Sequence, residues 1–434
     1  MATVALRGNK KVIRAWTIYD WANSVYQLSI TSAILPAYYG AVAKGDDQGL
    51  VTFFGFSIVN TTLYAWTVSA SFLLVAIFSP LLASTADYTG RRKLFMQIFT
   101  WMGCLGCAGL FFFTKENLEW GIFSFFIASV GYSGGLVFYN AWLPEIALPG
   151  DEDKISARGY ALGYTGGVVL LILNLMMLLN PQWFGLQPGG MAARISFLTV
   201  AVWWLGFAQI TFKALPKYFV PPKSEKRPLF NGYRELQKVF SEFRKQEALL
   251  RFITGFFFTM MAVLTVMYMA ANFGKKELNL DDQVLIPTIL IIQLVGVAGS
   301  IGFARLSSRI GNIRALLVSI IIWIGICIGA YYVNNAGGFM VLASVVGLVM
   351  GGIQALARST YSKLLPKTND HTAYYSFYDV AEKLAVVLGT FLFGLLEWIT
   401  GSMRASILLL GILFILGFIT LFNLRNSKKL SAYE

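Results

Sequence analysis

The chain has 434 residues, of which 56% are hydrophobic and only 13% are charged. Soluble domains have roughly 45–50% apolar and about 25% charged residues, so this composition excludes an ordinary soluble protein and indicates a membrane protein. The net charge of +13 does not indicate a nucleic-acid-binding protein, because the basic residues lie in the connections between apolar runs.

Apolar runs of about 20 residues recur along the chain, and each can cross a hydrocarbon core of roughly 30 Å as a helix. In lipid the backbone must satisfy its own polar groups, and the runs lack the short alternation of barrel strands. The sequence therefore predicts an all-α membrane protein with twelve transmembrane helices. They cover residues 16–43, 60–84, 94–114, 120–142, 158–180, 192–213, 249–272, 284–304, 315–334, 338–358, 377–399 and 405–424.

The basic residues indicate the orientation of the helices. Most of the 35 Lys and Arg residues precede the first helix, follow the last one, or fall in the even-numbered connections. By the positive-inside rule this distribution places both termini in the cytoplasm, and in a bacterium the membrane would be the inner membrane. The basic N-terminus has no short apolar core with a cleavage site, so we interpret the first helix as a retained anchor.

The longest polar connection divides the chain into two halves. We expect an N-terminal six-helix bundle at 1–213, a cytoplasmic linker at 214–248, and a C-terminal six-helix bundle with a short cytoplasmic tail at 249–434. Apolar residues at helical spacing between 230 and 243 predict an amphipathic helix that lies on the inner leaflet as a strap. A solvated linker helix is the alternative.

Internal repetition supports this division. Residues 134–149 and 351–366 both begin with Gly-Gly and end with Leu-Pro, and both pairs are displaced by 217 positions. Two pseudo-symmetric six-helix bundles around a central axis are typical of alternating-access transporters, which hold substrate near the bilayer midplane between the halves.

Polar residues lie on the first predicted helix. Asp20, Asn23, Tyr26 and Gln27 are spaced at i, i+3, i+6 and i+7, and we expect this stripe to face a central cavity. An ionisable group within a membrane helix is expensive, so Asp20 is a candidate for binding a proton or a cationic group of cargo near the cytoplasmic mouth. A structural ion pair or helix cap is the alternative for Asp20, and interhelical hydrogen bonding for the stripe.

Helices 4 and 10 carry further candidates for binding. Tyr139 and Asn140 could hydrogen-bond polar cargo, although packing or interfacial anchoring is the alternative. Gln354 and Arg358 are spaced at i and i+4, and Arg358 could offer its guanidinium to a carboxylate of the cargo. Arg358 could equally extend to the cytoplasmic surface. The connection after helix 4 holds residues that we interpret as surface or gating charges: Glu145, Asp151, Glu152, Asp153, Lys154 and Arg158.

Helix 11 carries the second charged cluster. Asp379 and Lys383 are spaced at i and i+4 and can neutralise each other. Glu382 is then left as the candidate proton site, because burial favours the neutral form of a carboxylate. A salt-bridge cluster that only fixes helix 11 is the alternative.

The stretch LLASTADYTGRRKLF resembles the loop signature of the major facilitator superfamily. The blocks YDWANS, FYNAWLPEIA, RGYALGYTGG, GGIQALARS and FYDVAEK resemble the vacuolar amino-acid effluxer-like branch of that superfamily. The resemblance implies the major facilitator fold, secondary transport and, among cargoes, amino acids first.

The resemblance also implies a conformational latch made of Asp87, Gly90, Arg91 and Arg92. It places Asp87 against the cytoplasmic start of helix 11, where exposed amides stabilise a negative charge by about 0.3–1 kcal/mol. Such a contact would stabilise the outward-facing state. Ser308 stands at the matching place in the second half, so we expect the latch to be asymmetric.

The sequence argues against an enzyme. The single histidine, His371, is expected in a loop, so no catalytic group built on two histidines can form. No phosphate-binding loop is present, which removes ATP-driven pumping. We expect no cofactor and no metal, a small-molecule substrate, protons as the candidate coupling ion, and a monomer in the bilayer. The alternatives are an exporter of amphiphilic drug-like or lipid-like molecules, and a membrane scaffold or sensor without transport.

Overall fold

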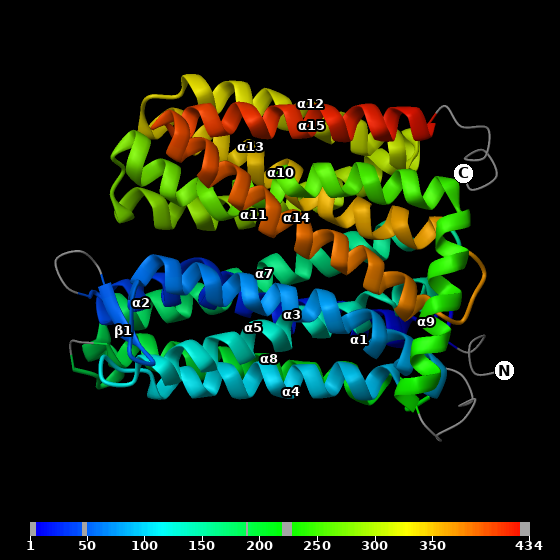
Figure 1. Ribbon diagram of the computed structural model, residues 1–434, viewed down its shortest axis with the longest axis horizontal. Coiled ribbons are helices and arrows are strands. Elements are labelled where there is room, and N and C mark those ends of the chain that lie inside the picture. Colours follow the sequence, from blue (N-terminus) through cyan, green and yellow to red (C-terminus); the bar gives the residue numbers. More distant parts are fainter. Residues whose placement is uncertain (1–5, 46–49, 188–189, 219–227, 426–434) are drawn as a thin grey trace.

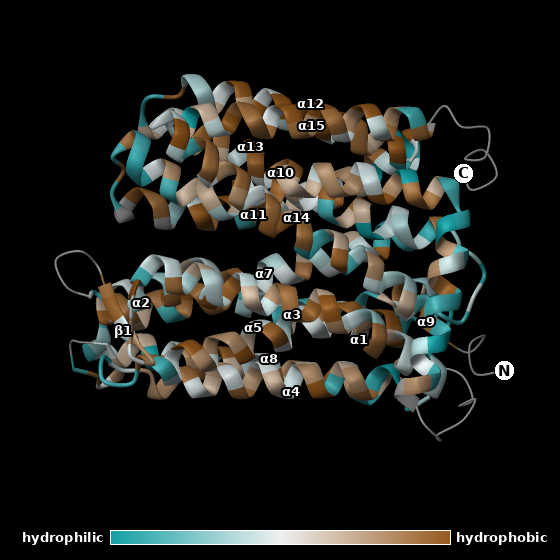
Figure 2. Ribbon diagram, viewed as in Figure 1, coloured by the Kyte–Doolittle hydropathy of each residue, from teal (hydrophilic) through white to brown (hydrophobic). Residues whose placement is uncertain are grey.

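The computed structural model describes residues 6–45, 50–187, 190–218 and 228–425. Long helices run roughly side by side in two groups, and one short helix, α9, crosses the end of both (Figure 1). Apolar residues follow the helices along their length, whereas hydrophilic residues gather at the ends and on α9 (Figure 2). Within the described residues, eleven helices are long and apolar enough to cross a membrane.

The first predicted span, 16–43, is not one regular helix. It consists of α1 (Lys10–Val25), the π-helix η1 (Tyr26–Ile34) and α2 (Leu35–Val42). Asn9 caps the start of α1, because its Oδ1 accepts hydrogen bonds from the amides of Lys11 and Val12 at 3.0 and 3.4 Å. The count of twelve spans therefore stays a prediction, since it treats these three segments as one crossing.

A hairpin that the sequence analysis did not predict follows α2. Strands β1 (Leu50–Phe53) and β2 (Phe56–Val59) pair antiparallel, with Leu50 opposite Val59 and Phe53 opposite Phe56. The turn residues Phe54 and Gly55 both have positive φ, 47° and 84°, as a two-residue hairpin turn of type I′ requires. The hairpin is a local addition to a helical fold.

The remaining elements fall into the two halves of the chain. The N-terminal half contains α3 (Asn60–Thr89), α4 (Arg92–Gly109), η2 (Leu110–Phe112), α5 (Leu118–Asn140), α6 (Leu143–Ile146), α7 (Glu152–Leu179), η3 (Pro181–Phe184) and α8 (Met191–Ala214). The C-terminal half contains α10 (Glu247–Leu278), α11 (Asp282–Ile310), α12 (Asn312–Tyr332), α13 (Ala336–Leu364), α14 (His371–Thr400) and α15 (Met403–Arg425).

Several helices continue past their predicted ends. An apolar window stops at the first polar residues, but α7 begins at Glu152, α13 ends at Leu364 and α14 begins at His371. The expectation that His371 lies in a loop was wrong. It is the first residue of α14, where its ring is buried and bonded to another helix.

The apolar interior forms two clusters, one for each half. The first cluster contains buried residues from Leu6 to Leu215. The second contains buried residues from Val239 to Leu424, joined by Phe72, Ala141 and Tyr164 of the first half. The halves meet along a seam in which α7 packs against α11 and α3 packs against α14.

Helix α9 (Pro228–Lys245) crosses this seam and is not a freely solvated linker. Gly232 lies so close to α3 that an added Cβ would meet Thr85 Oγ1 at 2.3 Å. The ring of Phe243 packs on Phe377 of α14 with centroids 4.9 Å apart, and Val239 is fully buried. The start of α1 and the end of α15 lie at the same end of the molecule, which we call the α9 end (Figure 1).

Two predicted segments cannot be compared with the structure. The proline-rich part of the linker, 219–227, and the tail, 426–434, lie outside the described residues.

Candidate functional site

A cavity of about 120 Å³ lies between the two halves. Its walls come from α1, η1, α3, α5 and α7 on one side and from α10, α11, α13 and α14 on the other. Nine of the residues singled out in the sequence line it: Asp20, Asn23, Gln27, Asn140, Gln354, Arg358, Asp379, Glu382 and Lys383. The structure thus brings together polar residues that lie up to 363 positions apart in the chain, between Asp20 and Lys383.

A buried ion pair joins the halves beside this cavity. Both terminal nitrogens of Arg358, on α13, lie 3.2 Å from Oδ2 of Asp20, on α1. The remaining donors of Arg358 bond to the side chain and carbonyl of Ser156 at 2.9 and 2.8 Å and to Asn140 at 3.4 Å. These five contacts match the five N–H groups of a guanidinium. In this conformation Arg358 therefore holds the halves together and has no donor left for a carboxylate of the cargo.

Aromatic rings surround the Arg358 guanidinium. Its carbon lies 4.2 Å from the ring centre of Tyr160, 4.9 Å from that of Trp16 and 5.6 Å from that of Tyr139. Tyr139 does not line the cavity. Instead its hydroxyl donates to Asp20 Oδ2 at 2.7 Å, and its ring stacks on Trp16. Rings of this kind attract a cation, and the attraction strengthens where water is excluded.

Tyr26 does not face the cavity as the sequence analysis expected. Six residues at 100° each place it about 120° away from Asp20 around the helix, and the π-helix begins at this residue. Its hydroxyl is bonded to Ser129 on α5 at 2.7 Å, and its ring stacks on Tyr132. Tyr26 is a packing contact between η1 and α5.

A second charged cluster lies on the α14 wall. Lys383 Nζ is 3.2 Å from Asp379 and 3.7 Å from Glu382, so one cation serves two carboxylates. The side chains of Asp379 and Lys383 are 4% and 6% exposed, whereas that of Glu382 is 29% exposed. Asp379 Oδ2 is buried and has no hydrogen-bond partner within the described residues. Buried acceptors are normally satisfied, so this oxygen is open for a proton or a ligand.

The sequence analysis missed several residues of the cavity wall. Tyr160 and Tyr164 lie one helical turn apart on α7, and Tyr164 donates to Gln354 at 2.8 Å. Tyr268 of α10 and Gln293 of α11 also line the cavity. The spacing of Tyr160 and Tyr164 at i and i+4, next to glycines, could have predicted that this face of α7 lines the cavity. The single residues on α10 and α11 had no such pattern.

The glycines beside these tyrosines allow α7 to approach α1. A Cβ at Gly159 would lie 2.3 Å from Asp20 Oδ2 and 2.9 Å from Arg358 Nη2, and one at Gly163 would lie 2.5 Å from Ser24 Oγ. We expect Gly159→Ala to displace the ion pair and to lower transport at least about 10-fold, because overpacking typically costs about 1–3 kcal/mol. Flux into liposomes that contain the purified variant measures this effect.

Gly206→Ala is the matched control for this prediction. Nothing lies within 4 Å of a Cβ at Gly206, so its flux should equal that of the unmodified chain, and its melting temperature should not fall because alanine favours a helix over glycine. Equal flux for Gly159→Ala and Gly206→Ala would contradict the role given to the contact at Gly159.

Asp87 belongs to α3, and its side chain contacts the N-terminus of α14 across the seam. Oδ2 accepts from the amide of Ala373 at 2.8 Å, and Oδ1 accepts from the hydroxyl of Thr372 at 2.5 Å. Arg92 donates to Asp87 at 3.1 Å, to Thr372 at 2.6 Å and to the carbonyl of Ala141 at 2.7 Å. Asp87 and Arg92 are both fully buried side chains.

The other two residues of the expected latch have different surroundings. Gly90 ends α3 with φ of 68°, a left-handed conformation that glycine adopts without strain. Arg91 does not join the buried network. It donates to Tyr218 at 3.2 Å and lies over the ring of that residue.

Two further polar networks cross the seam at the α9 end. Glu145 lies 2.7 Å from the ring nitrogen Nδ1 of His371 and 3.9 Å from Arg92. Asp153 lies 2.8 Å from Lys363 and accepts hydrogen bonds from Ser307 and Asn312. Glu145 and Asp153 are buried contacts between the halves, so they are not surface charges.

Comparison with known proteins identifies the family. A sequence model of the family described as "Vacuole effluxer Atg22 like" matches residues 8–433 of the chain. The chain belongs to the vacuole effluxer Atg22-like family. The uncharacterized MFS-type transporter YxiO of Bacillus subtilis is 30% identical over 410 residues, which cover 94% of this chain and 93% of YxiO. Autophagy-related protein 22 of Yarrowia lipolytica is 22% identical over 479 residues, which cover 88% of this chain and 79% of that protein.

Solved structures identify the fold of this Atg22-like chain. The human organic anion transporter MFSD10 (TETRAN) superimposes with a TM-score of 0.74 at 14% identity, over 95% of this chain and 99% of MFSD10. At that identity the likeness establishes the fold, which is the major facilitator fold. The Atg22-like chain is therefore an integral multi-pass membrane protein and a transporter, and it is not an enzyme.

Proposed function

We propose that this Atg22-like chain is a secondary active transporter of a small polar or zwitterionic metabolite, with amino acids as the first candidates. The observation that carries the proposal is the convergence of Asp20, Arg358, Asp379, Glu382 and Lys383 on one cavity between the halves. Burial of charged groups in a membrane protein costs free energy, so such groups usually mark a functional site. These five residues line the expected substrate path.

The size and chemistry of the cavity support small polar cargo over amphiphilic cargo. Pockets for drug-sized ligands have volumes of roughly 300–1,000 Å³. The cavity here has about 120 Å³. Its open groups include a carboxylate oxygen of Asp379 and the amide side chains of Asn23 and Gln293, which can bind an ammonium and a carboxylate respectively.

The charges of the α14 cluster support coupling to protons. Lys383 can neutralise only one of Asp379 and Glu382, so the cluster keeps one negative charge in excess. The sequence argument for Glu382 relied on burial, whereas Asp379 is the more buried of the two carboxylates at 4% against 29% exposure. A proton on Glu382, which stays our proposed site, or the ammonium of the cargo would remove the excess charge. Release of the proton or of the cargo on the far side of the membrane would restore the excess negative charge. The movement of protons is thereby linked to the movement of cargo.

The proposed cycle moves the halves 1–213 and 249–434 against each other, with 214–248 as the linker. We place both termini in the cytoplasm, so the α9 end faces the cytoplasm. The buried networks of Asp20, Asp87, Glu145 and Asp153 then close the cytoplasmic side in this structure, and they must break before the cavity can open inward. Residues of a single chain line the central cavity on both sides, which supports a functional monomer.

Transport by purified protein tests the proposal. The chain is reconstituted into liposomes with an imposed pH gradient, and a panel of radiolabelled amino acids, sugars and amphiphilic dyes is presented. We expect saturable flux of one or more amino acids that depends on the gradient. Flux of the dyes alone would favour the amphiphilic alternative. No flux of any compound in either direction would favour a scaffold or sensor.

Glu382→Gln tests the proton site. Glutamine keeps the shape of the side chain but cannot take up or release a proton. We expect exchange of labelled for unlabelled cargo to continue, while accumulation driven by the pH gradient is lost, because intramembrane carboxylates serve as proton relays. Glu397→Gln on the same helix is the control, because Glu397 bonds Lys276 away from the cavity. Gradient-driven accumulation that survives Glu382→Gln would refute this assignment.

A further inference from the structure

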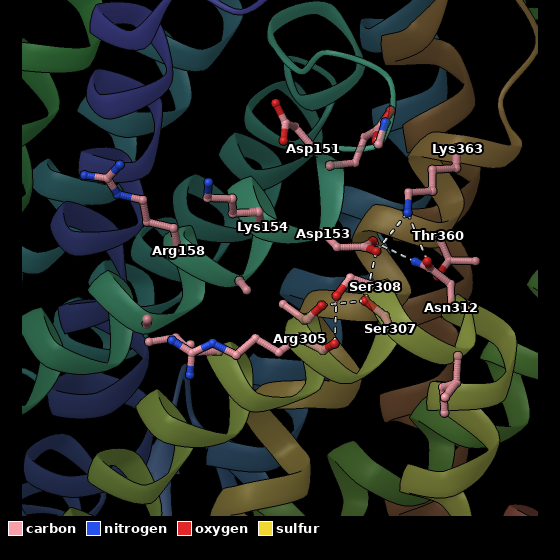
Figure 3. A pocket seen from close by; sticks show the side chains of 18 of the residues that line it. Asp151, Asp153, Lys154, Arg158, Arg305, Ser307, Ser308, Asn312, Thr360 and Lys363 are labelled. Atoms are coloured by element: carbon pink, nitrogen blue, oxygen red, sulfur yellow. Dashed lines mark hydrogen bonds and ion pairs between the residues drawn. The ribbon is translucent and has the colours of Figure 1, made fainter. Parts of the chain in front are cut away.

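A second and larger cavity, of about 1390 Å³, opens at the α9 end of the seam (Figure 3). It lies between the start of α7 in the N-terminal half and α11, α12 and α13 in the C-terminal half. Among the residues that the structure describes, none lines both this cavity and the central one.

One side of this cavity is closed by a neutralised network. Asp153 of α7 contacts Lys363 at 2.8 Å, Asn312 at 2.7 Å and Ser307 at 2.9 Å. Asn312 also donates to Thr360 at 3.0 Å. The donors around Asp153 come from three helices of the other half, and this side therefore offers no free charge to a ligand.

The other side carries cations from both halves. Lys154 and Arg158 come from α7 and Arg305 from α11. Arg314 of α12 also lines the cavity, and all four side chains are exposed. Within residues 6–45, 50–187, 190–218 and 228–425, these four side chains have no ion-pair partner. The charged ends of Lys154, Arg158 and Arg305 lie on the side away from the Asp153 network (Figure 3).

The charge of this cavity is positive overall. Five basic and three acidic side chains line it, and Asp153 is already paired with Lys363. Cations on opposite sides of a seam repel each other, so the closed arrangement favours an anion that can contact both halves. A phosphate group meets this need, because guanidinium groups bind its oxygens in pairs.

The floor of the cavity is apolar. Ala161 and Leu162 follow Arg158 on α7 within about one helical turn, and Val297 and Ile301 precede Arg305 on α11. The spanning part of α11 is only 22% buried within the protein, the lowest fraction among the eleven spans, so much of its apolar surface is uncovered. The basic residues at the mouth of the cavity match the headgroup of a phospholipid, and the apolar floor matches its acyl chains.

We propose that this cavity binds an anionic phospholipid from the leaflet at the α9 end. Arg158 and Arg305 hold the headgroup phosphate from the two sides of the seam, and an acyl chain lies along Leu162 and Ile301. A zwitterionic lipid carries its own cation and leaves the excess positive charge uncompensated. A soluble anion would use the cations but not the apolar floor.

Photo-crosslinking with the full chain tests this site. The chain is placed in phosphatidylcholine nanodiscs that contain a phosphatidylglycerol with a photoreactive acyl chain, and cross-linked peptides are mapped by mass spectrometry. We expect label within 158–165 and 297–305. We expect unlabelled phosphatidylglycerol to compete and extra phosphatidylcholine not to compete. The variant Arg158→Gln/Arg305→Gln should lower the label at least about 10-fold, because each basic residue adds to the attraction of an anionic lipid.

Matched variants separate the site from general surface charge. Lys11→Gln/Lys213→Gln removes two exposed cations at the same end of the molecule and should keep the label. Leu162→Trp fills the apolar floor, retains every charge and should lower the label. Label that persists in Arg158→Gln/Arg305→Gln, falls equally in the Lys11 and Lys213 variant, or is removed by excess inorganic phosphate would overturn the proposal.

Discussion

Replacement of Arg358 by glutamine is expected to reduce transport roughly 10²- to 10³-fold and to lower the stability of the chain. The change leaves Asp20 buried at 6% exposure with Tyr139 as its remaining hydrogen-bond donor. Removal of one partner of a buried ion pair typically costs about 3–5 kcal/mol, because the other charge stays desolvated. Flux in liposomes and the melting temperature in detergent measure the two effects.

A double variant measures the interaction between Asp20 and Arg358 apart from the other effects of each substitution. Asp20→Asn/Arg358→Gln removes both charges, and we expect it to melt above Arg358→Gln alone, with a coupling free energy of roughly 0.5–3 kcal/mol. Arg251→Gln is the control, because Arg251 pairs with Glu247 on the surface, where both side chains are nearly half exposed. Such surface pairs contribute only about 0–1 kcal/mol. If Arg358→Gln behaves like Arg251→Gln, the pair does not hold the halves together.

Asp87→Asn is expected to shift the chain towards the state open at the α9 end. Asparagine keeps one acceptor oxygen, whereas Asp87 uses two to bind Thr372, Ala373 and Arg92. Hydrogen bonds to a charged group contribute about 1.5–3 kcal/mol, so the open population should rise roughly 10- to 100-fold. A cysteine at Ala141, which is fully buried at the seam, reports the change by its rate of alkylation.

The control for this experiment is Asp151→Asn at the same end of the molecule. Asp151 is exposed, and among the described residues its side chain has no hydrogen bond or ion pair with α14, so the labelling rate should not change. The three native cysteines, Cys104, Cys107 and Cys327, are buried and are replaced by alanine in the reporter background. Equal labelling rates with Asp87 and with asparagine at this position would exclude a latch role for Asp87.

Local pattern was enough to predict most of the helices, although not all of their ends, and part of two walls of the cavity. Apolar runs about 20 residues long have few alternatives to a helix in lipid. Asp20, Asn23 and Gln27 share a face because of the helical period, and Asp379 meets Lys383 because residues at i and i+4 are neighbours. These inferences need no knowledge of the tertiary structure.

The remaining contacts depend on packing between distant segments. Arg358 was a candidate either for binding cargo or for extending to the surface, and in this conformation it contacts Asp20, which lies 338 positions earlier in the chain. Asp153 and Lys363 are separated by 210 positions. No helical period reports such pairs. The expectation for Tyr26 was wrong for a different reason, because six residues at 100° each place it about 120° away from Asp20 around the helix.

Helix α9 contacts both members of the helix pair that Asp87 joins. Its first turns lie against the end of α3, where Gly232 leaves room for Thr85, and its last turns lie on the start of α14 through Phe243 and Phe377. Because these contacts lie on opposite sides of the seam, α3 and α14 cannot separate unless one set is lost. The segment that connects the halves in sequence thus also holds α3 and α14 together. A shorter or stiffer segment would reduce how far the two halves can separate at the α9 end.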